Sequence, residues 1–192
     1  MYRFPSYHRR ILFYLTILTA GLAGLPVADV RAQSEQRFFL QPYEFGFRAG
    51  SSISRGDDFT QFELFTTMAT PWGWMDEKRR FAARLDFQAT AGVLRNPDNT
   101  AGIFSFGPAV RLTPPPYPFY LTLGFAPTYL TQRRFGDVDF GQRLQFTSSA
   151  TATWMITPEV GLRYHIQHMS NARMASPNPG LNIHSAGVVI AF

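Results

Sequence analysis

Hydrophobic and polar residues alternate along most of the chain from about residue 42 onward. The pattern is clearest in YEFGFRAGSSI (43–53), FAARLDFQATAGV (81–93), FYLTLGFAPTY (119–129) and LQFTSSATATW (144–154). A period of two is typical of β-strands, because successive side chains of a strand point to opposite faces. The pattern predicts eight strands, at 42–55, 59–71, 80–94, 101–113, 117–130, 140–156, 158–170 and 181–192.

The two faces of these strands differ in chemistry. One face is apolar, as with Tyr43, Phe45 and Phe47 in the first strand. The other face carries charged residues, namely Glu44, Arg48, Glu63, Arg84, Asp86, Arg111 and Arg163. Such charges can pair inside a narrow barrel, but so many could not line the apolar cavity of a lipocalin-type soluble barrel, which is the alternative.

Each predicted strand exceeds the about 9–11 residues that a tilted strand needs to cross a membrane. The predicted fold class is therefore all-β, an eight-stranded antiparallel transmembrane β-barrel. Both ends of such a barrel lie on the periplasmic side of a bacterial outer membrane, so the loops near residue 56, after Leu94, at 133–139 and at 171–180 are expected to be extracellular. The terminal Phe192 fits this class and predicts recognition by the barrel assembly machinery.

The first 32 residues have the parts of a secretory signal peptide. A basic segment, MYRFPSYHRR, precedes an apolar run, ILFYLTILTAGLAGL, and VRA precedes Gln33. We expect a signal peptide at 1–32 and the barrel at 33–192, with an uncleaved anchor helix as the alternative. Residues 1–32 hold four arginines and one aspartate, so their removal lowers the formal net charge from +5 to about +2. This small charge gives little support to a nucleic-acid partner, and a chain without cysteine is not a disulfide scaffold.

The segment HMSNARMASPNPGLN (168–182) carries the candidate chemistry. His168, Ser170 and Asn182 share the parity of the apolar face, so they are expected on the outside of the barrel at its extracellular rim. Polar groups that face lipid cost free energy unless they have a use. A serine with a histidine two positions away on the same strand face can form a nucleophile–base pair. The obvious substrate for such a site is a lipid of the outer leaflet.

The motif His168-Met169-Ser170-Asn171-Ala172 followed by Pro177-Asn178-Pro179-Gly180, together with the chain's size and eight-strand layout, resembles the lipid A 3-O-deacylases of the outer membrane (the PagL family). The resemblance implies an esterase that removes the ester-linked 3-hydroxyacyl chain at position 3 of lipid A, with lipopolysaccharide as its substrate. It also implies that His168 and Ser170 are catalytic and that Asn171 stabilises the oxyanion.

The sequence departs from the family pattern at position 182. The family's glutamate, which orients the histidine, falls where this chain has Asn182. An amide can orient the ring but brings no charge to stabilise the imidazolium. We therefore expect a slower or differently assisted enzyme, with Asp137 or Asp139 as an alternative source of charge.

Other parts of the site and the choice of partners stay open. Four arginines near the rim are candidates for binding lipid A phosphates or for general contact with lipopolysaccharide: Arg133, Arg134, Arg143 and Arg173. No cofactor or metal is implied, since His165 and His168 fall on opposite faces, although a His168–His184 pair is possible in geometry. A homodimer is neither required nor excluded. The alternative function is a non-catalytic barrel with a structural or adhesive role, whereas a pore is disfavoured because side chains fill an eight-stranded barrel.

Overall fold

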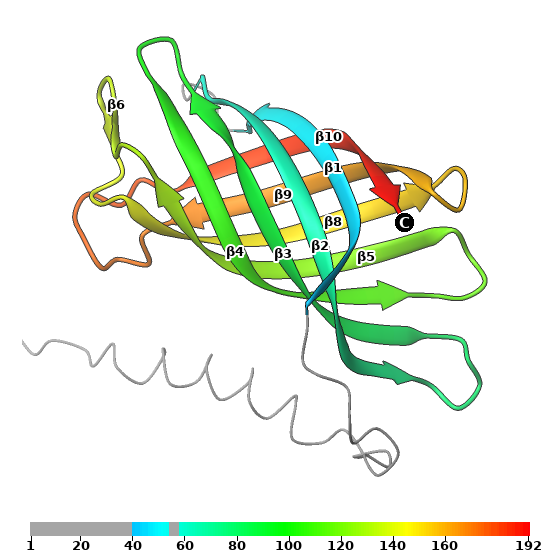
Figure 1. Ribbon diagram of the computed structural model, residues 1–192. Helices are drawn as coiled ribbons and strands as arrows, with labels where there is room; N and C mark the ends of the chain where they lie inside the picture. Colours follow the sequence, from blue (N-terminus) through cyan, green and yellow to red (C-terminus); the bar gives the residue numbers. More distant parts are fainter. Residues whose placement is uncertain (1–39, 54–57) are drawn as a thin grey trace, which may run out of the picture. The chain divides into compact units, whose positions relative to one another are not determined.

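Eight antiparallel strands close into a barrel in the computed structural model, which describes residues 40–53 and 58–192 (Figure 1). The order around the barrel is β1-β10-β9-β8-β5-β4-β3-β2. The strands are β1 (Gln41–Ser52), β2 (Thr60–Met75), β3 (Ala82–Arg95), β4 (Thr100–Thr113), β5 (Phe119–Leu130), β8 (Leu144–Met155), β9 (Val160–Ser170) and β10 (Leu181–Ala191). This confirms the predicted all-β, eight-stranded barrel. The expected signal peptide at 1–32 lies outside the described residues.

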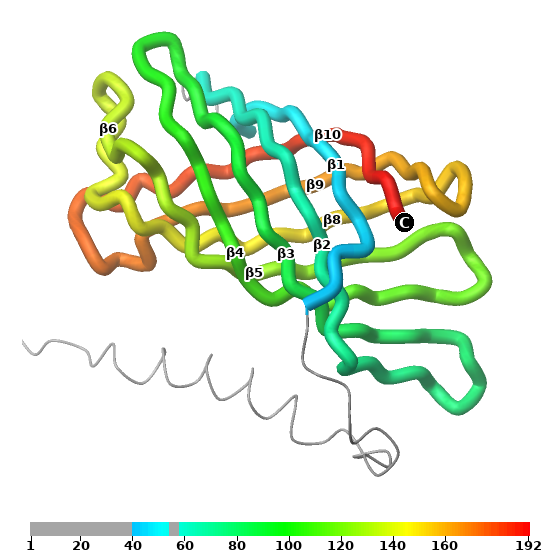
Figure 2. Tube along the Cα trace, viewed as in Figure 1, coloured from blue at the N-terminus to red at the C-terminus, as the bar shows by residue number. Residues whose placement is uncertain are grey.

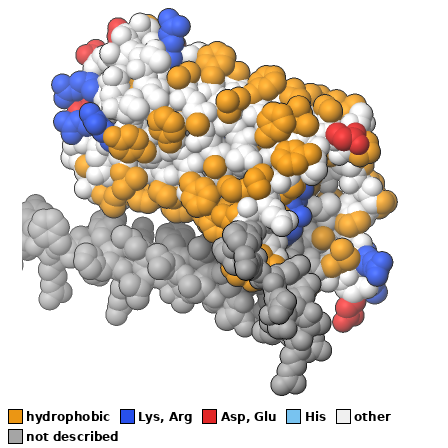
Figure 3. Space-filling model, viewed as in Figure 1, with side chains coloured by type: hydrophobic (Ala, Val, Ile, Leu, Met, Phe, Trp, Pro, Cys, Tyr) orange, Lys and Arg blue, Asp and Glu red, His pale blue; other side chains and the backbone are white. Residues whose placement is uncertain are grey.

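The apolar face of the strands points outward. Phe47, Leu64 and Leu162 are more than half exposed, whereas Glu44 and Asp86 are almost completely buried. Figure 3 shows hydrophobic side chains over the flank that β1–β4 form, with charged side chains mainly toward the two ends. So large an apolar surface suits lipid and not water, and it excludes the soluble lipocalin-type alternative. Among the described residues, no helix is long and apolar enough to span a membrane.

The interior is filled by paired polar side chains. Arg163 donates from Nη2 to Oε2 of Glu44 at 2.9 Å, and Arg111 and the Tyr120 hydroxyl also bind this carboxylate. Four residues further along β1 than Glu44, Nε of Arg48 donates to Glu63 at 2.6 Å. This pairing offsets the cost of taking the charges out of water. The alternation therefore directs the charged side chains into the interior, where opposite charges pair.

Tyr43 is an exception to the alternation. A register shift between Pro42 and Glu44 in the pairing of β1 with β2 interrupts the period of two. The Tyr43 hydroxyl donates to Asp86 at 2.6 Å, and the Arg111 guanidinium lies 4.9 Å from the centre of the ring. The prediction that Tyr43 faces outward is thus wrong, because the irregularity turns it toward the interior charges.

A short hairpin occupies the loop predicted at 133–139. It consists of β6 (Arg134–Phe135) and β7 (Val138–Asp139), and β8 accordingly begins later than expected. Phe135 and Phe140 pack against Phe59, with ring centroids 5.3 and 5.9 Å from its own. These rings join a buried apolar cluster of Leu94, Ala101, Ile103, Leu130, Met169, Leu181 and Ile183. The cluster fills the barrel beneath the hairpin.

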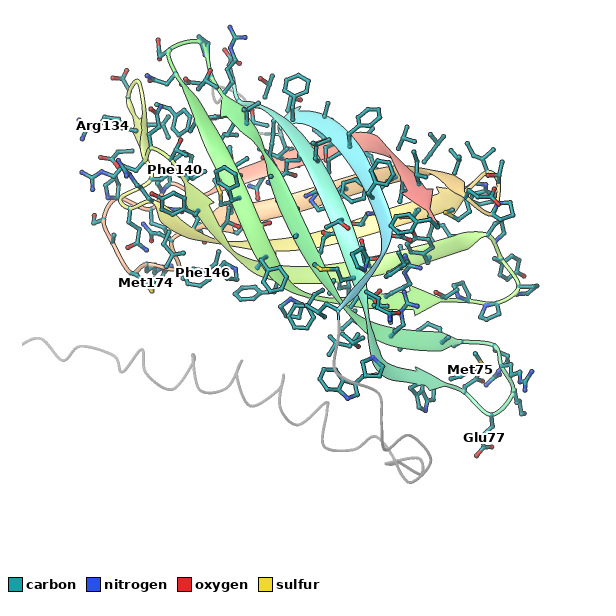
Figure 4. All side chains as sticks on the ribbon, in the orientation of Figure 1. Met75, Glu77, Arg134, Phe140, Phe146 and Met174 are labelled. Atoms are coloured by element: carbon teal, nitrogen blue, oxygen red, sulfur yellow. The ribbon has the colours of Figure 1, made fainter. Side chains whose placement is uncertain are left out.

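The hairpin and the β9–β10 loop lie at the same end of the barrel. Figure 4 places Arg134, Phe140 and Met174 together there, and Met75 and Glu77 at the opposite end. The tube in Figure 2 shows the C-terminus toward that opposite end, where the β2–β3, β4–β5 and β8–β9 turns also lie. The candidate segment 168–182 therefore belongs to the end that carries the hairpin.

Candidate active site

The register between β9 and β10 brings His168 and Asn182 together. The two residues are direct cross-strand partners, and both side chains are exposed on the outward face of the barrel. Nδ1–H of His168 donates to Oδ1 of Asn182, with 2.8 Å between the heavy atoms. Phe146, which is labelled in Figure 4, is the cross-strand partner of Ser170 and marks the level of the site near the barrel end.

The contact with Asn182 determines which ring nitrogen is basic. A carbonyl oxygen can only accept, so the proton of the neutral ring resides on Nδ1 and the lone pair on Nε2. Within the described part of the chain, Nε2 has no hydrogen-bond partner. It is therefore not hydrogen-bonded to the hydroxyl of Ser170. That half-buried hydroxyl lies two residues further on the same strand face. Hydrogen bonds of this kind are often long without substrate and shorten in the complex, so the pair is compatible with a nucleophile and its base.

Gly180 lies against the imidazole ring. A β-carbon at this position would be 3.1 Å from Cε1 of His168, and the backbone has φ +70°. A side chain would be strained by this φ and would press on the ring. Glycine here lets the loop turn into β10 and leaves room for His168.

Asn171 is buried beneath the loop, with its side chain turned away from the lipid-facing surface. Its Nδ2 lies within 2.9–3.0 Å of the carbonyl oxygens of Phe140, Ala175 and Pro177. The residue is 0% exposed. The expected contact between this side chain and an oxyanion does not fit the geometry, because its two amide hydrogens already face carbonyls inside the protein. The observed position suits a residue that holds the loop.

The chain turns sharply after Asn171. Ala172 and Arg173 have φ values of +53° and +63°, a region that residues with a side chain rarely adopt. The backbone N–H of Met174 donates to the carbonyl of Asn171 at 3.0 Å. Within residues 40–53 and 58–192, the N–H groups of Ala172 and Arg173 meet no protein acceptor. They are therefore candidate donors to an anion beside Ser170.

The arginines of the hairpin are held by Asp139. Nε of Arg133 is 3.7 Å and Nη2 of Arg134 is 2.9 Å from the Asp139 carboxylate. Hydrogen bonds from Arg134 and from the Gly141 backbone keep the pKa of Asp139 below its usual range. Asp139 is thus engaged by arginines and is not the partner of His168, and Asp137 is exposed on the hairpin.

The other sequence candidates are dispersed. Arg143 is exposed, with Nη1 3.5 Å from the hydroxyl of Tyr129, and Arg173 is exposed on the loop. His165 points into the barrel, where Nδ1 lies 2.7 Å from the hydroxyl of Thr151. His184 contacts Ser51 and Tyr164 instead of His168, so the structure does not form the histidine pair considered from the sequence.

Replacing Asn171 by Asp is expected to loosen the β9–β10 loop. The change exchanges the donating amide for a carboxylate oxygen that faces three carbonyl oxygens in a buried site, which is repulsive. Cleavage by trypsin after the exposed Arg173 should then become about tenfold faster. Gln132→Glu makes the same chemical change at a position nearer the surface and is the control. Equal cleavage rates for wild type and Asn171→Asp would contradict the role of Asn171 in holding the loop.

Comparison with known proteins gives consistent matches. The family model described as lipid A 3-O-deacylase (PagL) matches residues 60–191. A curated protein of Bordetella bronchiseptica, lipid A deacylase PagL, is 37% identical over 67 residues, which are 34% of this chain and 36% of that protein's length. The aligned part of the chain thus spans about a third of this relative.

Among solved structures, the outer membrane enzyme PagL superposes with a TM-score of 0.68 at 16% identity and covers 78% of this chain and 99% of its own. This match shows a shared fold. Neisserial surface protein A gives a TM-score of 0.48 at 14% identity, over 79% of this chain and 97% of its own.

Proposed function

Because the chain belongs to the lipid A 3-O-deacylase (PagL) family, we propose that it is an outer-membrane esterase that hydrolyses the ester-linked 3-hydroxyacyl chain at position 3 of lipid A. The observation that carries the proposal is the hydrogen bond between His168 and Asn182 on the outward face of the barrel. It leaves Nε2 of His168 basic, on the same strand face as Ser170. A nucleophile and base that face lipid can reach an ester only in a membrane lipid.

The proposed reaction has two steps. Oγ of Ser170 attacks the ester carbonyl while Nε2 of His168 takes its proton, and His168 then returns this proton to the departing sugar oxygen. The C–O bond to the sugar breaks, and the acyl chain is held on Ser170. In the second step His168 activates water, which attacks the acyl-serine and releases a 3-hydroxy fatty acid and the free serine. No cofactor enters either step.

The negative charge on the carbonyl oxygen needs donors close to Ser170. The backbone N–H groups of Ala172 and Arg173 fit this role in the proposal, because the left-handed turn leaves them without acceptors in the part of the chain that the structure describes. Asn171 would act indirectly, since its buried amide holds the loop in place. Asn182 would keep the His168 ring oriented.

The arginines of the rim suit the phosphate groups of lipid A. Arg133 and Arg134 share one carboxylate, Asp139, so these three side chains together carry a net positive charge. Arg143 and Arg173 add exposed guanidinium groups at the same end of the chain's barrel. Guanidinium groups bind phosphate strongly, often through two parallel hydrogen bonds. We propose these four residues as contacts for the lipid A head group.

The proposed orientation places the hairpin and the β9–β10 loop outside the cell. In this arrangement the chain is exported by the signal peptide at 1–32, and the mature barrel is inserted by the assembly machinery through Phe192. The short turns are periplasmic, as is usual for outer-membrane barrels, and the active site faces the outer leaflet.

Cysteine labelling tests this orientation. The chain has no cysteine, so single substitutions give an unambiguous signal. Ser176→Cys in the β9–β10 loop should react with a membrane-impermeant maleimide on intact cells. Thr157→Cys in the β8–β9 turn should react only after the outer membrane is permeabilised. The reverse pattern would show that the barrel is inserted the other way round.

The lipid A of expressing cells tests the proposed function. Mass spectrometry of lipid A from a host that lacks such an enzyme should show the loss of one 3-hydroxyacyl chain when the protein is present in its outer membrane. Lipid A of unchanged composition, with folded barrel in the membrane, would contradict the proposal and favour a structural or adhesive role.

A further inference from the structure

A polar cluster interrupts the apolar outer surface next to the His168–Asn182 pair. It consists of Ser51 on β1, His184 on β10 and Tyr164 on β9, and is called the His184 cluster below. Oγ of Ser51 lies 3.3 Å from Nε2 of His184, and the Tyr164 hydroxyl lies 3.5 Å from Nδ1. The rings of Tyr164 and His184 meet edge to face, with centroids 6.3 Å apart. The neighbouring outward side chains in the strand registers are apolar: Ile166 opposite His184, Ala186 opposite Tyr164, and Ala49 opposite Ala186.

The three side chains cannot satisfy one another completely. A neutral imidazole has one donor and one acceptor nitrogen. If Nε2 carries the proton, it donates to Ser51, and the Ser51 O–H is left without an acceptor in the cluster. If Nδ1 carries the proton, it donates to Tyr164, and the Tyr164 O–H is left. In both tautomers one hydroxyl donor points into an apolar surface, where an unmet donor is costly. This favours a ligand with a polar group at this place.

The position of the cluster relates it to the candidate active site. His184 is the next outward residue after Asn182 on β10, about 7 Å further along the strand. In the proposed orientation this step leads from the rim toward the middle of the membrane. An acyl chain whose ester lies at Ser170 and His168 runs down the outside of the barrel in the same direction. The cluster therefore borders the path of the chain that is cleaved or of its neighbour on the same lipid.

We propose that the His184 cluster binds the hydroxyl group of a 3-hydroxyacyl chain and makes the enzyme selective for hydroxylated chains. The inference rests on the proposed function. The methylene groups of an acyl chain cannot accept a hydrogen bond from the hydroxyl that the cluster leaves unpaired. The 3-hydroxyl group of an acyl chain is both a donor and an acceptor, so it can form this hydrogen bond. In lipid A this group occurs on the ester-linked chain and on the neighbouring amide-linked chain.

Synthetic monosaccharide lipids test the inference. Three substrates are needed: one with both 3-hydroxyl groups, one without the hydroxyl of the ester-linked chain, and one without that of the amide-linked chain. Wild-type kcat/KM should fall about tenfold when the recognised hydroxyl is missing, because one hydrogen bond is lost. The substrate that shows the fall identifies the chain that is bound.

Variants of the cluster should remove this selectivity without removing activity. In His184→Phe and Tyr164→Phe, the ratio of kcat/KM between hydroxylated and deoxy substrates should fall from about ten to near one. Val188→Ala, an outward position on the same strand outside the cluster, should keep the preference. A wild type that cleaves all three substrates equally, or variants that slow all three by the same factor, would overturn the inference. A folded wild type that cleaves none of them would instead overturn the proposed function, and the inference with it.

Discussion

Ser170→Ala and His168→Ala are each expected to lower the rate of lipid A deacylation by about a thousandfold or more, while the barrel still folds. The first change removes the attacking oxygen, and the second removes the base that takes its proton. Neither should disturb folding, because both side chains lie on the outer surface of β9 and not in the packed interior. The comparison requires initial rates on purified lipid A in detergent, with heat-modifiable gel mobility to confirm folding.

Ser148→Ala is a sharp control for this experiment. Ser148 is an exposed serine on the outward face of β8, and it is the direct cross-strand partner of His168. It therefore lies beside the same histidine but outside the motif. We expect Ser148→Ala to retain the wild-type rate. If Ser148→Ala were inactive and Ser170→Ala active, the nucleophile would have been assigned to the wrong strand.

Replacing Asn182 with a carboxylate is expected to raise the deacylation rate by about tenfold. The present contact orients the ring and fixes the proton on Nδ1, but an amide adds no charge to stabilise the imidazolium that forms when Ser170 attacks. Asn182→Asp supplies the charge with the length of the side chain unchanged, and Asn182→Glu restores the residue type that the family pattern has. Asn182→Ala should lower the rate, since the ring then loses its orienting partner.

The same rate measurements separate three outcomes. A faster Asp or Glu variant means that charge is what the site lacks. Asp and Glu variants slower than wild type would show that the site is adapted to an uncharged residue as the partner of His168. Equal rates for Asn, Asp, Glu and Ala would contradict any catalytic use of the 2.8 Å contact between His168 and Asn182.

The alternation of residues was sufficient to predict the barrel and its inside and outside, since one parity is apolar along the strands and most charged residues of β1–β4 and β9 fall on the other. It could not predict Tyr43, because an irregularity in strand pairing leaves no mark in hydropathy. The hairpin at 134–139 was also missed, as its strands are only two residues long. Two residues are too few to show an alternation of apolar and polar side chains.

The candidate site was predictable only in part. Parity placed His168, Ser170 and Asn182 on one surface, and the short connection from β9 to β10 made a His168–Asn182 contact foreseeable. The same parity places Asn171 on the inner face, so its burial could have been inferred, but its three carbonyl partners come from a loop and from the end of the hairpin. The partners of His184 depend on the pairing of β1 with β10, two strands far apart in the sequence.

The most direct test of the central claim is the set of products that the purified, folded protein makes from purified lipid A. We predict equal molar amounts of a free 3-hydroxy fatty acid and of lipid A with a free hydroxyl at position 3, with all other acyl chains retained. Fragmentation mass spectrometry of the product locates the lost chain. Release of a chain from any other position, or recovery of intact lipid A, would contradict the account.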